Sequence, residues 1–575
     1  MRPPLSLACL LPLLSRLAPG SASPVPSCQT VLVSSEAATK GTKGAVASES
    51  SICSRIGIDT IAEGGSAADA MVATNLCVGV IGMYHSGIGG GGFMLVRDKD
   101  GMYEAIDYRE TAPAAADRDM YESNENGSVV GGLAVAVPGE LRGLQYLHRK
   151  YGVLPWKTLV MPSVRLAREG FQVNEDLVRY MKSASEGSTF LTDDPIWAED
   201  FAPNGTLVQI GDTITRKRYA DTLERIANEG PDIFYKGELA KSMIDFIQKL
   251  NGSMTLDDLE NYQIEVKPPL SITYGDYRLF TTEAPSSGAV MFNILKTMEQ
   301  FPVEDLIDTN LTTHRFVEAM KFAYGARQEL GDPDFIGNVS KLQKHMLSDE
   351  TARDTRSRIL DNQTQPVEVY DPKAVYAAES EGTSHIVTAD ASGLTITSTT
   401  TINLLFGAKI MTPDTGIILN NEMDDFSQPS RRNAFGFPPS PANFIAPRKR
   451  PLSSITPLIA EFASNRTLFL ATGAAGGSRI ISSTTQVAWG LLTSSETTMR
   501  GAIARPRLHH QLMPDELLIE EGADPGLAES LREKGHKVEW MAPGLSAVQG
   551  IMRLWDGRFD AVGETRQVNS GGYSV

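Results

Sequence analysis

One peptide bond in the second half of the chain most restricts what this sequence can fold into. Gly382 and Thr383 directly precede the segment His385-Ile386-Val387, which is typical of a buried strand, and a threonine-rich run follows from Leu394 to Asn403. A buried strand does not need to begin with Gly-Thr. If the bond between Gly382 and Thr383 is cleaved, Thr383 gains a free α-amine beside its own hydroxyl, as an N-terminal threonine nucleophile requires. The sequence therefore predicts a processing site at this bond.

Length and charge narrow the class of protein. With 575 residues, of which 41% are hydrophobic, the chain is long enough for several cores or for one large layered domain. The formal net charge of -17 argues against nucleic-acid binding, because the neutralisation of phosphates requires a basic face. An anionic substrate would therefore have to meet a locally placed cation.

The N-terminal residues resemble a secretory signal. Arg2 precedes an apolar stretch from Leu5 to Leu17, and small residues then resemble a cleavage site. We expect a signal peptide over residues 1–23 and a secreted protein. An uncleaved membrane anchor is the alternative, but Pro12 and Arg16 interrupt a run that is already shorter than the roughly 20 residues needed to span a bilayer.

The cysteines and sequons agree with an oxidising compartment. Removal of the signal would leave Cys28, Cys53 and Cys77, which allows one disulfide and one odd thiol. Cys53 and Cys77 lie on neighbouring predicted helices, so we expect that pair, although sequence alone does not fix the connectivity. No Cys-x-x-Cys or His-Glu-x-x-His spacing occurs, and we expect neither a metal nor a cofactor. Sequons for N-glycosylation begin at Asn126, Asn204, Asn251, Asn310, Asn338, Asn362 and Asn465.

Hydrophobic periodicity predicts a helix-rich first part and a strand-rich second part. This pattern favours packed sheets covered by helices in one domain. Residues 350–382 are polar, and we expect an irregular, exposed segment there that can be cut or can swing away. The main predicted elements are helices over 48–63, 66–77, 159–169, 177–183, 219–228, 239–250, 289–300 and 313–330, strands over 93–96, 103–108, 270–273, 277–282, 385–389, 394–400, 456–463 and 467–472, and a hairpin over 549–562.

A glycine run from Gly87 to Gly92 formally matches the G-x-G-x-x-G pattern of dinucleotide-binding folds. That pattern should follow a strand and open a helix, whereas here a predicted helix precedes it and a strand-like segment follows. We therefore interpret the run as a close approach of backbones near a site, which glycine permits because it has no side chain.

Seven motifs in a fixed order carry a family resemblance. Two precede the proposed nucleophile and five follow it. They are His85-Ser86-Gly87-Ile88-Gly89-Gly90-Gly91, Arg109-Glu110-Thr111-Ala112-Pro113, Thr399-Thr400-Thr401-Ile402-Asn403, Asn420-Asn421-Glu422-Met423-Asp424-Asp425, Pro451-Leu452-Ser453-Ser454, Gly473-Ala474-Ala475-Gly476-Gly477 and Arg505-Pro506-Arg507-Leu508-His509-His510. Together they resemble the γ-glutamyltransferase (γ-glutamyl transpeptidase) family over nearly the whole chain after the signal.

The resemblance implies an α+β fold, the αββα sandwich of N-terminal nucleophile hydrolases, made as a precursor that cleaves itself. The large subunit would be residues 24–382 and the small subunit residues 383–575, with both subunits interleaved in one domain. The chemistry is coherent on its own terms, since an α-amine has a reference pKa of about 7.7 to 8.0 and can take the proton of the Thr383 hydroxyl near neutral pH. Such a mechanism requires neither a histidine base nor a G-x-S-x-G elbow.

Catalytic roles follow from the resemblance position by position. Thr383 would be the nucleophile, Thr401 would hydrogen-bond near it and tune it, and the backbone N–H groups of Gly476 and Gly477 would form the oxyanion hole. Phe435, in a segment that resembles the family's lid, would shield the glutamyl pocket or else anchor the loop by packing.

The substrate head would be a zwitterion, which requires one cation and at least one carboxylate. From the residues alone, Arg109 could equally be a structural ion pair, because most charged residues are simply exposed. The residues implied for substrate binding are Arg109, Ser453 and Ser454 for the α-carboxylate, and Asn403, Glu422 and Asp425 for the α-ammonium.

The sequence thus predicts a secreted γ-glutamyltransferase that degrades glutathione and other γ-glutamyl compounds. Thr383 would attack the γ-amide, and the γ-glutamyl ester would pass to water or to an acceptor amino acid or dipeptide. One alternative is a related acylase of another amide, against which the Arg109 and Asp425 pair argues. The other is an unprocessed, inactive relative that serves as a binding protein, against which Thr383 and Thr401 argue.

Overall fold

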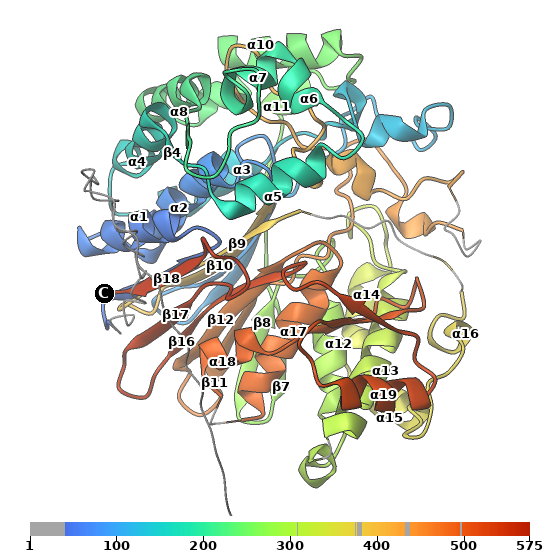
Figure 1. The fold of residues 1–575 in the computed structure, drawn as a ribbon. Coiled ribbons are helices and arrows are strands. Elements are labelled where there is room, and N and C mark those ends of the chain that lie inside the picture. Colours follow the sequence, from blue (N-terminus) through green and yellow to red (C-terminus); the bar gives the residue numbers. More distant parts are fainter. Residues whose placement is uncertain (1–40, 308, 374, 376–381, 432–437, 495–496) are drawn as a thin grey trace, which may run out of the picture. The chain divides into compact units, whose positions relative to one another are not determined.

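The computed structural model describes residues 41–307, 309–373, 375, 382–431, 438–494 and 497–575 (Figure 1). Three of the predictions fall outside these residues: the signal peptide over residues 1–23, the odd thiol Cys28 and the lid residue Phe435. Within the described part of the chain, no helix combines the length and apolar character needed to cross a membrane.

Two antiparallel sheets form the centre of the fold. The first has the strand order β18-β1-β9-β10-β2-β3-β6 and the second the order β17-β16-β12-β11-β8-β7. The strands of the first sheet are β1 (Gly44–Ser48), β2 (Gly91–Arg97), β3 (Tyr103–Asp107), β6 (Glu265–Lys267), β9 (Ser384–Asp390), β10 (Thr395–Thr401) and β18 (Gly571–Ser574). Those of the second are β7 (Leu270–Tyr274), β8 (Tyr277–Thr281), β11 (Leu458–Phe462), β12 (Leu468–Ala475), β16 (Ala547–Arg553) and β17 (Phe559–Val562).

The two sheets pack face to face, with β9 and β10 against β12. Alternate residues of a strand point to opposite faces, so Val387 joins an apolar cluster with Ile459 and Ala471 of the second sheet, whereas Ile386 packs toward the helices. All seven residues of β9 are buried, because both faces of this strand are covered.

Helices cover the outer face of each sheet, as Figure 1 shows. Helices α1 (Ser51–Ala62) and α2 (Ala67–Ile81) pack on the first sheet, and α12 (Gly288–Met298) and α17 (Arg479–Leu492) pack on the second. The predicted αββα sandwich is therefore confirmed. The other helices are α3 (Glu140–Tyr151), α4 (Trp156–Glu169), α5 (Glu175–Ala184), α6 (Phe190–Asp193), α7 (Pro195–Phe201), α8 (Lys217–Glu229), α9 (Asp232–Tyr235), α10 (Glu238–Lys249), α11 (Leu256–Glu260), α13 (Thr309–Arg327), α14 (Val339–Met346), α15 (Asp349–Arg358), α16 (Val367–Tyr370), α18 (Met499–Ala504) and α19 (Pro525–Glu533). Short strands complete the fold: β4 (Phe171–Gln172), β5 (Thr213–Ile214), β13 (Leu508–His509), β14 (Leu517–Glu520) and β15 (Val538–Met541).

The first two helices form a covalently linked pair. Ser66 and Asp69 make a capping box at the start of α2, in which each side chain accepts a hydrogen bond from the other residue's backbone N–H. Cys53 of α1 and Cys77 of α2 are joined by a disulfide with a Cα–Cα distance of 5.3 Å. The predicted pairing of these two cysteines is confirmed.

The prediction of an irregular segment over residues 350–382 is wrong at two places, helix α15 and the short helix α16. Ser348 caps α15 by accepting a hydrogen bond from Thr351 N. Acidic residues occupy the first turn and two arginines the last, which complements the helix dipole. Because few of its side chains are apolar, the segment lacked the periodicity that identifies a helix from sequence.

Buried histidines are a feature of the second half of the chain. Both ring nitrogens of His385 on β9 are hydrogen-bonded. Nδ1 lies 2.8 Å from Thr399 Oγ1, and Nε2 lies 2.9 Å from Thr397 Oγ1. Burial lowers the pKa of His385 to about 3. It also lowers the pKa of His509 to about 3 and that of His510 to about 4.

These histidines make folding stability sensitive to acid. An unfolded histidine has a pKa of about 6.5, so below that pH the unfolded state binds more protons and stability falls. We expect the unfolding free energy of His385→Gln to decline less steeply than that of the wild type between pH 6 and pH 4.5, by up to about 1.4 kcal/mol per pH unit. Urea titrations of both proteins at several pH values measure this slope. Parallel pH profiles would contradict the prediction.

The disulfide should stabilise the fold by restricting the unfolded chain. It closes a loop with a sequence separation of 24, which corresponds to about 3.5 kcal/mol in the chain-entropy model. We expect the double variant Cys53→Ser/Cys77→Ser to melt at a lower temperature than the wild type. As a control, a reducing agent should lower the wild-type melting temperature and leave that of the double variant unchanged. Equal melting temperatures for the two oxidised proteins would count against this role.

Candidate active site

Thr383 lies where the two sheets meet. It directly precedes β9 of the first sheet and is only 4% exposed. Its hydroxyl oxygen Oγ1 accepts a hydrogen bond of 2.9 Å from the backbone N–H of Gly476, which directly follows β12 of the second sheet. A side chain at Gly476 would collide with Leu545 O, because a Cβ would lie 2.5 Å from it. The predicted nucleophile and one predicted oxyanion donor are therefore in contact.

Thr401 is aimed at the bond predicted to be cleaved. Its hydroxyl donates to the carbonyl oxygen of Gly382 at 2.8 Å and accepts from Asn403 N at 2.7 Å, so its proton is directed at that carbonyl. Gly382 has φ of 130°, and a Cβ there would lie 2.4 Å from Asn403 O. This backbone conformation and this contact both require glycine before Thr383.

Gly477 differs from Gly476 in its contacts. Within the described residues, the backbone hydrogen bond to Thr383 comes from Gly476, while the carbonyl of Gly477 accepts from Ile480 N in the first turn of α17. Gly477 has φ of 61°, a left-handed conformation that glycine adopts easily. A second oxyanion donor at Gly477 remains a prediction.

A buried charge cluster surrounds Arg109, which is 1% exposed. Arg109 Nη1 donates to Glu422 Oε1, and Nη2 donates to Asp425 Oδ2. Glu110 Oε2 lies 3.9 Å from Nη1. The predicted carboxylate-binding cation and two of the predicted ammonium-binding residues are thus brought together, paired with each other. Glu110, for which no role was predicted, is the third carboxylate near Arg109.

Burial dominates the electrostatics of this cluster. It raises the pKa of Glu110 to about 8 and the pKa of Glu422 well above its usual range, although the charge of Arg109 opposes both shifts. Burial would lower the pKa of Arg109, but the neighbouring Glu422 and Asp425 carboxylates outweigh it and keep that pKa raised. Glu422 Oε2 and Asp425 Oδ1 have no hydrogen-bond partner among the described residues.

Asn403 and the two serines occupy fixed positions. Asn403 has φ of 69°, its Nδ2 donates to Asn421 O at 2.9 Å, and its Oδ1 is buried with no partner in the described part of the chain. Ser453 Oγ accepts from Ile455 N at 3.2 Å. Ser454 Oγ accepts from Arg327 Nη2 at 3.0 Å, so a buried arginine near the end of α13 positions the second serine.

Two asparagines for which no role was predicted hold these pieces together. Asn443 is fully buried; its Nδ2 donates to Asp425 O at 2.6 Å and its Oδ1 accepts from Leu452 N at 2.9 Å, which ties the acidic turn to the Ser453-Ser454 segment. Asn420 donates to Gly89 O at 2.8 Å and accepts from Glu422 N at 2.9 Å. An asparagine in a loop gives no periodic signal, so only position in a motif could have identified either one.

The glycine run approaches other backbones closely, as expected. A Cβ would lie 2.1 Å from Ile418 O at Gly89, 1.9 Å from Thr401 O at Gly90 and 2.0 Å from Thr399 O at Gly92. The run therefore lets the start of β2 and the residues before it pass directly beside β10 and Ile418.

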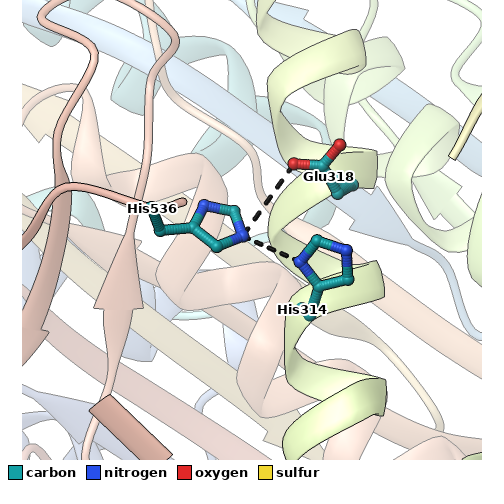
Figure 2. A group of neighbouring side chains, drawn as sticks. All are labelled: His314, Glu318 and His536. Atoms are coloured by element: carbon teal, nitrogen blue, oxygen red, sulfur yellow. Dashed lines mark hydrogen bonds and ion pairs between the residues drawn. The ribbon is translucent and has the colours of Figure 1, made fainter. Parts of the chain in front are cut away.

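A group of potential metal ligands lies outside this site, and Figure 2 shows it: His314 and Glu318 of α13, and His536. His314 Nε2 lies 2.7 Å from Leu360 O and must donate to it, which leaves Nδ1 to accept from His536 Nε2 at 2.8 Å. His536 Nε2 lies 4.0 Å from Glu318 Oε1. The two histidines thus already satisfy one another through a hydrogen bond.

The remaining partners of this group favour a hydrogen-bonded cluster over a metal site. Glu318 accepts hydrogen bonds from Thr364 Oγ1 at 2.7 Å and from Tyr370 OH at 2.6 Å. The Nζ atom of buried Lys321 lies 4.0 Å from Glu318 Oε1. A metal-bound histidine usually donates its second N–H to an acceptor, yet His536 Nδ1 has no partner among the described residues. We interpret the group as structural.

Comparison with known proteins identifies the family. The family model described as Gamma-glutamyltranspeptidase matches residues 53–573. A glutathione hydrolase proenzyme of Arthroderma benhamiae is 49% identical over 547 residues, covering 93% of each chain, and a glutathione hydrolase of Aspergillus flavus is 47% identical over 537 residues, covering 92% of this chain and 89% of that one. The crystal structure of a cephalosporin acylase from Bacillus halodurans has a TM-score of 0.79 at 25% identity and covers 96% of this chain and 98% of that one. The chain belongs to the gamma-glutamyltranspeptidase family.

Proposed function

We propose that this chain is a γ-glutamyltransferase that hydrolyses glutathione and related γ-glutamyl amides through Thr383. The observation that carries the proposal is the hydrogen bond from the Gly476 N–H to the Thr383 hydroxyl, in a member of this family that also buries an arginine–carboxylate cluster around Arg109. Relatives named glutathione hydrolases share nearly half of its residues.

Cleavage of the precursor would be the first reaction of Thr383. Its Oγ1 attacks the carbonyl carbon of Gly382, the peptide nitrogen leaves as the α-amine of Thr383, and water hydrolyses the resulting ester. The Thr401 hydroxyl, which donates to Gly382 O, would stabilise the negative charge that develops on that oxygen. The products would be the large subunit, residues 24–382, and the small subunit, residues 383–575.

Turnover would reuse the same hydroxyl. The liberated α-amine takes the hydroxyl proton of Thr383, Oγ1 attacks the γ-amide carbon, and the amine of the substrate departs with the proton. Gly476 N–H would stabilise the oxyanion, an interaction worth on the order of 3 kcal/mol per donor. The γ-glutamyl ester then passes to water, which completes hydrolysis, or to the amine of an amino acid or dipeptide.

Recognition of the substrate head would be an exchange of partners. A γ-glutamyl α-carboxylate would replace Glu422 and Asp425 on Arg109, with Ser453 and Ser454 as further donors. The α-ammonium would bind the carboxylates so released and the side-chain oxygen Asn403 Oδ1. The carboxylate oxygens Glu422 Oε2 and Asp425 Oδ1, like Asn403 Oδ1, lack hydrogen-bond partners among the described residues. Each charge of the zwitterion would then face an opposite charge, and its binding would leave the net charge of the desolvated site unchanged.

Secretion belongs to the same proposal. The predicted signal peptide over residues 1–23 would direct the chain to an oxidising compartment, in which the disulfide of Cys53 and Cys77 is stable. Occupancy of the sequons stays a prediction.

The acylase alternative rests on the shared fold. The cephalosporin acylase has only 25% identity to this chain, and a buried site that matches a zwitterion with one cation and two carboxylates favours a γ-glutamyl head. The inactive binding protein is disfavoured by the retained Thr383 and Thr401 and their hydrogen bonds.

Self-cleavage can be tested on a denaturing gel. We expect the wild type to migrate as two chains and Thr383→Ala to remain one chain. Thr401→Val should slow cleavage by about 100-fold, because it removes one donor to the developing oxyanion. Thr400→Val is the matched control, since its hydroxyl donates to Glu140 at 2.7 Å and not to Gly382. A single uncut wild-type band with no γ-glutamyl amide cleavage would refute the enzyme proposal.

Head-group recognition can be tested with two amides that differ only in the α-ammonium, a γ-glutamyl amide and the corresponding glutaryl amide. The wild type should strongly prefer the first. Asp425→Asn should lower kcat/KM for the γ-glutamyl amide by about 100-fold, since loss of one partner of a buried charge pair costs about 3 kcal/mol. The same variant should show a smaller ratio of kcat/KM for the γ-glutamyl amide to kcat/KM for the glutaryl amide than the wild type does.

Asp424→Asn is the matched control for this test. Asp424 adjoins Asp425, but its carboxylate accepts from Ser128 Oγ at 2.7 Å and is not bonded to Arg109 in the described residues. An unchanged preference in Asp425→Asn, or an equal loss in both variants, would argue for a different head-binding site.

A further inference from the structure

The cleavage of the precursor needs a base that the later turnover does not. During turnover the free α-amine of Thr383 takes the hydroxyl proton. In the uncut chain this nitrogen belongs to the peptide bond between Gly382 and Thr383, and a backbone N–H only donates. The proton of Thr383 Oγ1 must therefore pass to another group when Oγ1 attacks the carbonyl carbon of Gly382.

A cavity of about 250 Å³ adjoins this peptide bond and limits the choice of base. Its described lining contains one imidazole, that of His85, and no carboxylate. The two arginines of this lining cannot act as bases, because a guanidinium stays protonated in proteins. Burial raises the pKa of Tyr180, which also lines the cavity, to about 12, so its hydroxyl keeps its proton at neutral pH. Among the described lining residues, His85 is the one base.

The His85 ring presents its Nε2 edge to the bond that is cleaved. Nδ1 lies 3.4 Å from Glu49 Oε2, and a carboxylate only accepts, so Nδ1 carries the proton and Nε2 keeps its lone pair. The carbon Cδ2, which is bonded to Nε2, would lie 3.6 Å from a Cβ on Gly382. Nε2 has no hydrogen-bond partner among the described residues, and it is therefore available to accept a proton.

Neighbouring groups fix this orientation of the ring. The rings of Tyr84 and Tyr180 contact the imidazole edge-on, with centroids 4.6 Å and 4.4 Å away. The backbone carbonyl of His85 accepts from Ile402 N at 2.9 Å. Ile402 directly follows Thr401, whose hydroxyl would stabilise the oxyanion of the same reaction. The end of β10 therefore positions both groups.

Glu49 connects the imidazole to the segment that is cut. This residue directly follows β1 and is 6% exposed, and its second carboxylate oxygen accepts from Ser384 Oγ at 2.8 Å. Ser384 is the residue after Thr383. One buried carboxylate thus contacts the imidazole and the residue beside the nucleophile. In a carboxylate–histidine–hydroxyl triad the carboxylate has this role, because it fixes the tautomer and the orientation of the ring.

We propose that His85 is the general base of self-cleavage and that Glu49 positions it. The proton of Thr383 Oγ1 passes to His85 Nε2, directly or through one water molecule, as Oγ1 bonds to the carbonyl carbon of Gly382. The imidazolium then gives a proton to the Thr383 nitrogen as the C–N bond breaks, which yields the neutral α-amine and restores the imidazole. This inference rests on the proposed function and concerns the step before the α-amine exists.

The rate of self-cleavage tests this assignment. The full-length chain can be pulse-labelled in an oxidising cell-free system, shifted to a chosen pH and followed on a denaturing gel. We expect His85→Ala to cleave about 100-fold more slowly than the wild type, the lower end of what a general base contributes. If His85→Ala fails to fold, His85→Gln, which keeps a polar side chain, decides in the same assay.

The pH profile gives a readout that a structural role would not move. The wild-type rate should fall on acidification, because a protonated imidazole cannot accept a proton, and the residual rate of the His85 variants should lack this fall. The titratable and charged groups of the elements around the ring are Glu49, Tyr84, Asp176, Arg179, Tyr180 and Arg479. Glu49→Gln should also slow cleavage, and Glu49→Asp, which keeps the carboxylate, should restore part of the rate.

Chemical rescue separates a missing base from a damaged structure. Imidazole added to His85→Ala should restore much of the rate, whereas pyrazole, which has a similar shape but is a much weaker base, should not. After the imidazole is removed, the cut variant should hydrolyse a γ-glutamyl anilide, because its free α-amine then serves as the base. No rescue, or equal rescue by both compounds, would overturn the role of His85.

His148→Ala is the matched control. This histidine also contacts an aromatic ring edge-on, that of Trp156, and its Nε2 lies 2.8 Å from Leu154 O, but it does not line the cavity. Its self-cleavage should match that of the wild type and should not respond to imidazole.

Failure of this inference differs from failure of the proposed function. If the wild type cuts itself and the His85 variants cut equally fast with the same pH profile, His85 is not the base and the γ-glutamyltransferase stands. A wild type that neither cuts itself nor cleaves a γ-glutamyl anilide would overturn both.

Discussion

The site depends on the contact between the start of β9 and the end of β12. These strands belong to different sheets, so the hydrogen bond from Gly476 N to Thr383 Oγ1 forms only where the sheets are packed face to face. Gly476 allows this contact because a side chain there would collide with the Leu545 carbonyl oxygen. The packing of the two sheets therefore sets the position of the Thr383 hydroxyl relative to Gly476 N–H for every proposed step.

The charges of Arg109 and Arg179 are compensated to different degrees. Arg109 is buried and can remain charged because two carboxylates lie against it, whereas Arg179 is partly exposed and needs less compensation. The first environment suits a zwitterion that replaces one set of ion pairs by another. The second places a cation in the wall of the cavity beside Thr383 but supplies no base, because a guanidinium stays protonated.

The sequence predicted regular elements better than it predicted local contacts. Strands β9 and β10 and the helix pair α1 and α2 follow from apolar periodicity and caps, and motif order located Thr383, Arg109 and Asp425. Helix α15 was missed because its stability comes from caps and dipole charges rather than from an apolar face. The roles of Asn443 and Glu49 were missed because a buried polar side chain in a loop has no periodic signature. Their importance depends on partners far away in the chain, such as Leu452 for Asn443.

The hydrogen bond from Thr401 to Gly382 O has a consequence for biosynthesis. Thr401 lies at the end of β10, whose pairing with β9 and β2 must be complete before its hydroxyl reaches that carbonyl. If cleavage needs this contact, a misfolded chain keeps its peptide bond and never acquires a nucleophile. Self-cleavage would then depend on correct folding, and only molecules that have already reached the native topology would become active.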